Sequence, residues 1–137
     1  MPLFNFKHKE NLNQQRTLQQ RRGDSAEDIA CKYLQQQGLK FITRNYRCRY
    51  GEIDLIMQTV DEPFELLVFV EVRHRKTTTY GSGLDSINYH KQKKLNKTAN
   101  HYLSHQTKNI DQNCRFDVIS IDGLLTNNNV TWLKNAI

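Results

Sequence analysis

The 137-residue sequence has no long apolar run, no paired cysteines and no excess of acidic residues. Because a membrane-spanning helix needs about 20 apolar residues, such a helix is excluded, and no apolar signal-peptide core is present. The three cysteines are odd in number and far apart, which excludes a disulfide framework and a zinc knuckle. We therefore expect a soluble, cytoplasmic, single-domain protein with free thiols.

The shortage of acidic residues indicates the kind of partner. Fourteen Asp and Glu stand against twenty Lys and Arg, which leaves a formal charge of +6. A basic protein of this size favours a polyanionic partner, and nucleic acid is the first candidate. An anionic membrane surface is the alternative, but nothing in the sequence could anchor the chain in a membrane.

The hydrophobic pattern predicts an α/β domain with the element order αβββαβ. Apolar residues recur at helical spacing over 24–37, before the helix-stopping Gly38. A long helical crossover places the last strand parallel to the third, which gives a mixed central sheet flanked by helices. The predicted elements are a helix at 24–37, strands at 39–47, 52–58 and 66–72, a helix from 86 to about 105, and a strand at 115–121.

Two terminal segments lie outside this predicted domain, which spans residues 23–121. Residues 1–22 hold five basic residues and one acid. We interpret them as a mobile basic arm that either contacts phosphates or acts only as a solubilising tail. Residues 122–137 are rich in Asn, with Trp132 as their only large anchor, and either pack back on the domain or fray.

Three acidic residues occupy positions that the pattern assigns to the interior. Glu27 borders the apolar stripe of the first helix, Asp54 lies within a strand, and Glu71 lies near the end of the most apolar strand. Buried carboxylates are costly unless they are paired or bound to a metal ion, and a divalent cation can hold several of them ionised together. Oxygen ligands favour Mg²⁺ or Mn²⁺ over zinc.

A buried set of salt bridges is the alternative interpretation of these acids. In that case Arg47, Arg73 or Arg115 would neutralise them, and the spacing excludes neither interpretation. Arg73 lies two residues beyond Glu71, on the same strand face, where a metal-bound phosphate would also need a cation. Asp117, in the middle of the last predicted strand, has no evident metal role, and we expect it to pair with Arg115 or a nearby backbone group.

The second predicted helix carries basic side chains. Lys91 falls inside its inner stripe, where it either offsets phosphate charge or extends past the stripe to solvent. His101 and His105 are four residues apart, a spacing that can bind a transition metal. No third ligand accompanies them, so we interpret them as surface histidines.

Several separated motifs resemble those of the YraN family of bacterial proteins. The similarity covers residues 23–121. That family resembles the Holliday junction resolvases, so the resemblance implies a restriction-endonuclease-like core and makes a homodimer worth testing. The motifs are Ala-Glu-Asp-Ile-Ala at 26–30, Asn-Tyr-Arg at 45–47, Gly-Glu-Ile-Asp-Leu-Ile at 51–56, Phe-Val-Glu-Val-Arg-His-Arg at 69–75 and Arg-Phe-Asp-Val-Ile at 115–119.

The resemblance also implies a site. Glu27 corresponds to the helical acid of the family, Asp54 to the strand aspartate, and Glu71 to the acid of an acid-x-Lys motif. Arg73 occupies the lysine position of that motif. Arginine neutralises a phosphate but is essentially never deprotonated, so Arg73 cannot act as a general base.

The leading hypothesis is hydrolysis of a DNA phosphodiester that depends on Mg²⁺ or Mn²⁺. Asp54, Glu71 and the Val72 carbonyl would bind the ion, and Glu27 would orient a water molecule or a second ion. Arg73 or Lys91 would offset the remaining charge of the phosphate.

The alternative is a nucleic-acid-binding module on a nuclease-like scaffold without significant turnover. The arginine at position 73 supports it. Arg47, Arg75 and Lys94 would then contact backbone phosphates, which predicts binding that weakens steeply with salt. A protein-interaction adaptor with a basic surface ranks last.

Overall fold

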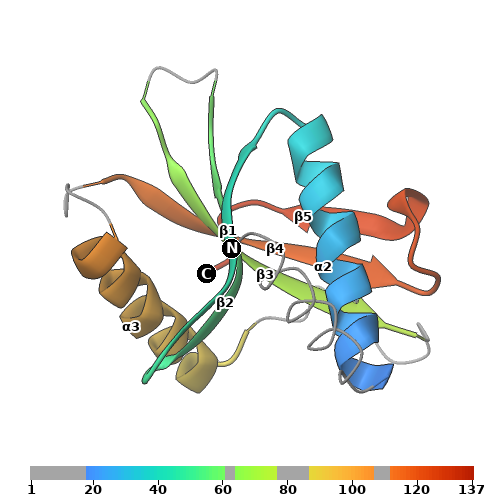
Figure 1. Ribbon diagram of the computed structural model, residues 1–137, viewed down its shortest axis with the longest axis horizontal. Helices are drawn as coiled ribbons and strands as arrows, with labels where there is room; N and C mark the ends of the chain where they lie inside the picture. The colour runs from blue at the N-terminus through green and yellow to red at the C-terminus, as the bar shows by residue number, and fades with distance from the viewer. Residues whose placement is uncertain (1–17, 61–63, 77–86, 107–111) are drawn as a thin grey trace, which may run out of the picture.

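The computed structural model is a five-stranded sheet with one helix packed on each face (Figure 1). It describes residues 18–60, 64–76, 87–106 and 112–137. The helices and strands are α2 (Leu18–Gln36), β1 (Lys40–Cys48), β2 (Gly51–Gln58), β3 (Leu67–Arg75), α3 (Tyr89–Gln106), β4 (Cys114–Asp122), a 3-10 turn η1 (Asn127–Asn129) and β5 (Val130–Leu133).

The strands follow chain order across the sheet, β1-β2-β3-β4-β5. β3 and β4 are parallel and pair from Leu67↔Cys114 to Arg75↔Asp122, whereas every other neighbouring pair is antiparallel. α3 makes the crossover between the two parallel strands. The predicted order αβββαβ and the predicted parallel pairing are both confirmed.

Alternate residues of β3 enter two separate cores. Val68 and Val70 pack with Ala30 and Leu34 of α2. Phe69, on the opposite face, packs with the inner side of α3. This alternation explains why the run is almost continuously apolar, since both faces of the strand are covered.

α2 begins earlier than the sequence predicts. It starts at Leu18 rather than at residue 24, so residues 18–22, which were predicted to belong to the N-terminal arm, are helical. The rest of the predicted arm, residues 1–17, lies outside the described residues.

The C-terminal segment packs back on the sheet. β5 pairs antiparallel with β4, from Ile121↔Val130 to Val118↔Leu133. The Ala136 N–H then donates to the Phe116 carbonyl at 2.8 Å. Of the two outcomes that the sequence left open, packing is the one observed. Within the described residues, no helix has the length and apolar character needed to cross a membrane.

Candidate functional site

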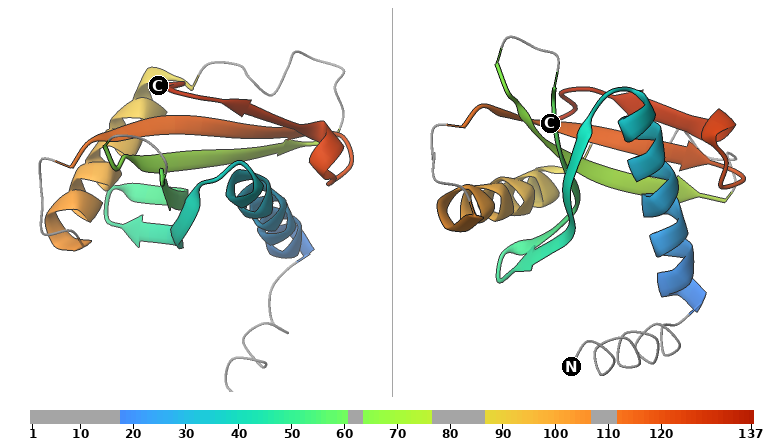
Figure 2. Two further views of the ribbon diagram at one scale, coloured as in Figure 1. Left: turned by 90° about the horizontal axis from the view of Figure 1, so that it is seen from above. Right: turned by 45° about the horizontal axis from the view of Figure 1, so that its top comes forward.

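The site forms where β2 and β3 separate. Their pairing stops at Leu55↔Val70, although both strands continue beyond it, and Figure 2 shows the two strands diverging from this point. The Val72 N–H, past the last pair, donates a hydrogen bond of 2.8 Å to Asp54 Oδ2. The Asp54 side chain thus accepts the hydrogen bond of the Val72 N–H where the backbone of β2 no longer pairs with β3.

Asp54 is surrounded by other carboxylates. The pKa of Asp54 is raised to about 8 in all; burial is the largest cause and the negative charge of Glu71 is the next. Glu27 and Glu52 also act to raise this pKa, whereas the hydrogen bond from the Val72 N–H acts to lower it. In the absence of a cation, Asp54 is therefore mostly protonated at neutral pH.

Three of these acids converge closely enough to share a metal ion. One carboxylate oxygen each from Glu27, Glu52 and Asp54 lies within 4.8 Å of the other two. Three hard oxygen donors fit a divalent cation such as Mg²⁺. We refer to Glu27, Glu52, Asp54 and Glu71 together as the acidic site.

Glu52 was not among the predicted site residues. The sequence held a signal for it, because Glu52 and Asp54 are two apart in one strand and so share a face. Glu71 was predicted as a metal ligand. It is outside the three-acid group, but its charge acts on Asp54.

Basic side chains of the chain itself contact the acidic site. Arg44 Nη2 lies 3.0 Å from Glu27 Oε2, and its Nη1 lies 2.5 Å from Asp28 Oδ1. Lys91 Nζ forms an ion pair with Glu71 Oε1, and only 10% of the Glu71 side chain is exposed. Lys91 is itself exposed, and its ammonium reaches from α3 to β3.

Two of the arginines that the sequence offered as partners for Glu27, Asp54 and Glu71 pair with other acids. Arg47 pairs with Glu52 at 3.3 Å, between two solvent-exposed side chains. Arg115 pairs with Asp117, away from the acidic site. The Arg44 contacts were not anticipated, because they join a helix to a strand and no sequence spacing indicates them.

The remaining predicted residues lie on β3 and α3. Arg73 and Arg75 are half-buried on β3, and Lys94 is exposed on α3. The Val72 N–H donates a hydrogen bond to Asp54. That the Val72 carbonyl is a metal ligand stays a prediction. The Lys91 N–H donates to Asn88 Oδ1 at 2.9 Å, so Asn88 caps α3 and places Lys91 in its first turn.

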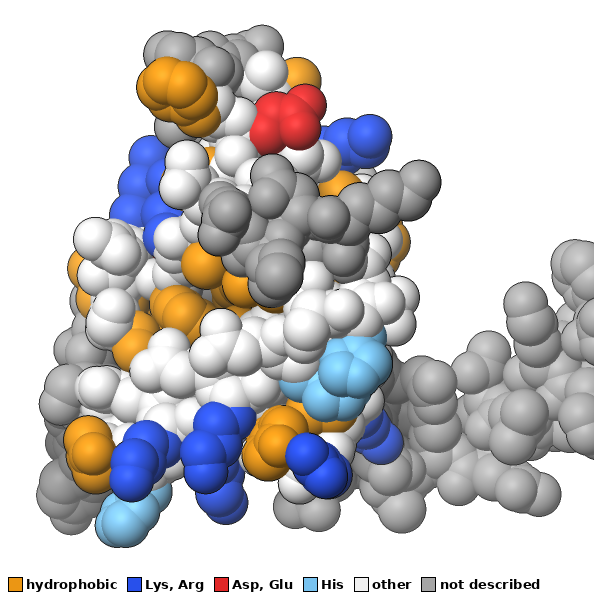
Figure 3. Space-filling view, turned by 90° about the vertical axis from the view of Figure 1, so that its left-hand side faces the viewer, with side chains coloured by type: hydrophobic (Ala, Val, Ile, Leu, Met, Phe, Trp, Pro, Cys, Tyr) orange, Lys and Arg blue, Asp and Glu red, His pale blue; other side chains and the backbone are white. Residues whose placement is uncertain are grey.

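α3 carries a basic outer surface. Its sequence contains four lysines and three histidines and no acidic residue. Lysines near the N-terminus of a helix interact unfavourably with the helix dipole. Their position at the start of α3 therefore does not stabilise the helix. In Figure 3, Lys, Arg and His side chains gather along the lower part of the face that α3 occupies. This surface could contact a polyanion.

Asp117 has a structural role. It is completely buried and accepts hydrogen bonds from Arg115 Nε at 3.0 Å, Trp132 Nε1 at 2.9 Å and the Asn135 N–H at 2.9 Å. The expected partners, Arg115 and a backbone group, are both confirmed. Asp117 thus ties the C-terminal segment to β4.

Comparisons with known proteins give one consistent family. The model of a family described as "Uncharacterised protein family UPF0102" matches residues 26–121. A UPF0102 protein of Nitrosococcus oceani is 45% identical over 115 residues, which cover 84% of this chain and 90% of that protein. One of Legionella pneumophila is 46% identical over 119 residues, covering 87% and 96%. One of Psychromonas ingrahamii is 48% identical over 115 residues, covering 84% and 88%.

These matches span the motifs that resemble the YraN family, so that resemblance is confirmed. The chain belongs to the UPF0102 family.

Proposed function

We propose that this protein is an endonuclease that hydrolyses DNA phosphodiesters with Mg²⁺ or Mn²⁺ bound at the acidic site. The observation that carries the proposal is the convergence of Glu27, Glu52 and Asp54 where two strands separate. Burial, followed by the negative charges of the neighbouring carboxylates, raises the pKa of Asp54 to about 8, which supports the proposal. Such a site gains most from a divalent ion.

The residues of the acidic site have separate tasks in this proposal. Glu27, Glu52 and Asp54 would hold the ion, and the Val72 N–H keeps the Asp54 carboxylate in place. Glu71, whose charge acts on Asp54 and which pairs with Lys91, would flank the scissile phosphate together with Lys91. A bound ion would supply a water molecule of lowered pKa and offset charge on the phosphate.

Arg73 contributes charge rather than proton transfer. It follows Glu71 by two residues on β3, so both side chains lie on the same strand face. A guanidinium stays protonated at any working pH, so Arg73 binds a phosphate oxygen and takes no proton from water. The proton of the attacking water must therefore pass to a carboxylate or to solvent.

A cleavage assay on defined DNA tests the proposal. Labelled duplex, flap and four-way junction substrates are incubated with Mg²⁺ or Mn²⁺ and with wild-type protein, Asp54→Ala or Glu27→Ala. A Glu65→Ala variant, purified identically, is the matched control, because Glu65 is exposed and outside the acidic site. We expect cleavage by wild type and Glu65→Ala only. Equal cleavage by all four proteins, or none by any, contradicts the proposal.

The second candidate is a nucleic-acid-binding module without turnover. Two ion pairs favour this candidate. Lys91 pairs with Glu71 and Arg44 pairs with Glu27, so two acids of the acidic site already have a cationic partner within the protein. In this case wild-type protein binds DNA with an affinity that falls steeply with salt, and added Mg²⁺ produces no cleavage. An affinity that does not change with salt rejects this candidate.

A further inference from the structure

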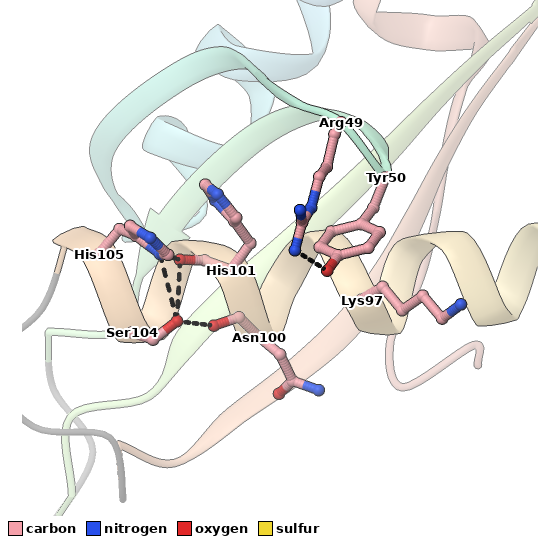
Figure 4. A pocket seen from close by; sticks show the side chains of 7 residues that line it. All are labelled: Arg49, Tyr50, Lys97, Asn100, His101, Ser104 and His105. Carbon is pink, nitrogen blue, oxygen red and sulfur yellow. Dashed lines mark hydrogen bonds between the residues drawn. The ribbon is translucent and has the colours of Figure 1, made fainter.

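A polar pocket lies between the β1–β2 turn and α3 (Figure 4). Its volume is about 360 Å³. Its lining residues, among those that the structure describes, come from the turn and from the part of α3 that begins at Lys97. From the turn they are Arg49 and Tyr50, and from α3 they are Lys97, Asn100, His101, Ser104 and His105.

The turn is held directly against α3. Cys48 pairs with Gly51, so Arg49 and Tyr50 form a two-residue connection. Gly51 has φ +152°, and a Cβ placed there would lie 3.2 Å from Thr98 Oγ1. A side chain at this position would crowd Thr98 and hold a backbone conformation that favours glycine. Glycine therefore permits the close approach of the turn to α3.

The charged groups of the pocket are cations. Arg49 Nη2 donates to the Tyr50 hydroxyl at 2.6 Å, and Lys97 Nζ lies 5.8 Å from the centroid of the Tyr50 ring. Among the described residues that line the pocket there is no Asp or Glu. The pocket thus offers a guanidinium at the Tyr50 hydroxyl and an ammonium near the Tyr50 ring, with no carboxylate among the described lining residues. Phosphate oxygens accept hydrogen bonds from such donors.

The histidines give the pocket a fixed wall. His101 Nδ1 is hydrogen-bonded to the Tyr46 hydroxyl at 2.5 Å, and the rings of His101 and His105 stack with centroids 4.0 Å apart. His101 is half-buried and His105 is exposed. Burial lowers the pKa of His101, and His105 and Arg49 lower it further. His101 therefore adds little positive charge to that of Arg49 and Lys97 at neutral pH.

We propose that this pocket binds a phosphate group of a nucleic-acid strand that runs along α3 to the acidic site. The inference rests on the proposed function and adds the path of the strand. Lys91, which contacts Glu71, is ten residues before His101 on α3, a distance of about 15 Å along the helix axis. That distance corresponds to about four nucleotides of a B-form strand. Lys94 and Lys97 lie between these two points and are exposed.

The test measures DNA binding without hydrolysis. Anisotropy of a fluorescein-labelled DNA duplex is recorded in EDTA over a range of KCl concentrations, for wild type and for the double variant Arg49→Ala/Lys97→Ala. The control is Lys32→Ala/Lys40→Ala, which removes the same charge from exposed positions on α2 and β1. We expect the pocket variant to bind about tenfold more weakly and its salt slope to fall by about 0.9 per lost phosphate contact.

The outcomes separate the pocket from the proposed hydrolysis. The pocket proposal is overturned if wild type does not bind the duplex, if the pocket variant binds like wild type, or if the control loses as much. Cleavage of the same duplex with Mg²⁺ is recorded separately. If the salt slope falls in Arg49→Ala/Lys97→Ala but wild type does not cleave the duplex, only the proposed hydrolysis is rejected. If wild type cleaves the duplex but the salt slope of the pocket variant is unchanged, only the pocket proposal is rejected.

A second readout reports on the pocket directly. The ring protons of His101 and His105 are followed by NMR while the unlabelled duplex is added. We expect their signals to shift in wild type and to stay in place in Arg49→Ala/Lys97→Ala. Signals that do not move in wild type overturn the proposal.

Discussion

The Val72 N–H donates a hydrogen bond of 2.8 Å to Asp54 Oδ2 just past the last residue pair between β2 and β3. This contact stabilises the ionised form of Asp54, but burial and the charge of Glu71 act in the opposite direction and keep its pKa at about 8. The carboxyl group is thus held in position although its ionised form is disfavoured. A cation could therefore bind there with little movement of the Asp54 side chain.

Metal binding should release a proton. Because the pKa of Asp54 is about 8, the group is mostly protonated at neutral pH and must ionise to bind a cation. We expect about one proton to be released per ion. Calorimetric titrations of Mn²⁺ in two buffers of different ionisation enthalpy measure this number. Equal heats in the two buffers would show that Asp54 is already ionised.

The acidic site should make the metal-free protein less stable as pH rises. The pKa of Asp54 is about 8 in the folded state and about 3.9 in an unfolded chain. Between these values the folded state binds more protons than the unfolded state, so the free energy of unfolding falls with increasing pH. Below both values this effect is absent.

An Asp54→Asn variant should lose this pH dependence. Its amide oxygen can still accept the Val72 N–H, and we expect it to be more stable than wild type at the upper end of the range, by a few kcal/mol at most. Urea unfolding in EDTA at several pH values measures the difference. Glu65→Gln is the control, and its stability should depend on pH as that of wild type does. If the free energy of unfolding of Asp54→Asn changes with pH in parallel with that of wild type, the pKa of Asp54 is not raised in the folded state.

Glu52 should be a metal ligand. Its carboxylate oxygen lies within 4.8 Å of those of Glu27 and Asp54, so Glu52→Gln should weaken Mn²⁺ binding about tenfold, or about 1.4 kcal/mol. Titrations of Mn²⁺ into Glu52→Gln and Glu65→Gln make a matched comparison, because Glu65 is an exposed acid outside the acidic site. Equal affinities for both variants would remove Glu52 from the site.

Lys91 should affect metal binding and cleavage in opposite directions. Its ammonium pairs with Glu71, so Lys91→Met leaves more negative charge near Asp54 and should tighten Mn²⁺ binding. The same change removes a cation that offsets phosphate charge, so cleavage should slow. Lys91→Arg keeps the charge and should change both less. Metal binding and cleavage that fall together in Lys91→Met would show that Lys91 only supports the fold.

Asp117 should be essential for stability and not for metal binding. Asp117→Ala leaves Arg115 without its partner and removes acceptors for Trp132 and Asn135, so we expect a loss of about 3 kcal/mol in the free energy of unfolding. Urea unfolding measures it, with Asp122→Ala as the control, because Asp122 is only half-buried. A similar small loss in both variants would contradict this role.

The pattern of apolar residues was sufficient to predict most of the fold. The run that became β3 is apolar on both faces because α2 and α3 cover them. β5 could not be predicted, because it has only four residues and depends on contacts of Trp132 and Asn135 with Asp117. Residues 18–23 of α2 have one apolar residue, Leu18, so no periodicity marks the helix start.

The candidate site was predicted in part. Glu27, Asp54 and Glu71 were each singled out because the pattern placed acids in apolar surroundings, and the structure brings them to one region. The contacts of Arg44 with Glu27 and of Arg49 with the α3 pocket depend on how β1 passes α2 and α3. Spacing along the chain carries no information about such contacts.

The central claim is that the acidic site binds a divalent cation through Asp54 and its neighbours. The most direct measurement is electron paramagnetic resonance of free Mn²⁺ during titration into the wild-type protein and into Asp54→Ala. The account predicts saturable binding by wild type and loss of that binding in the variant. No saturable binding by wild type, or the same binding by Asp54→Ala, would contradict it.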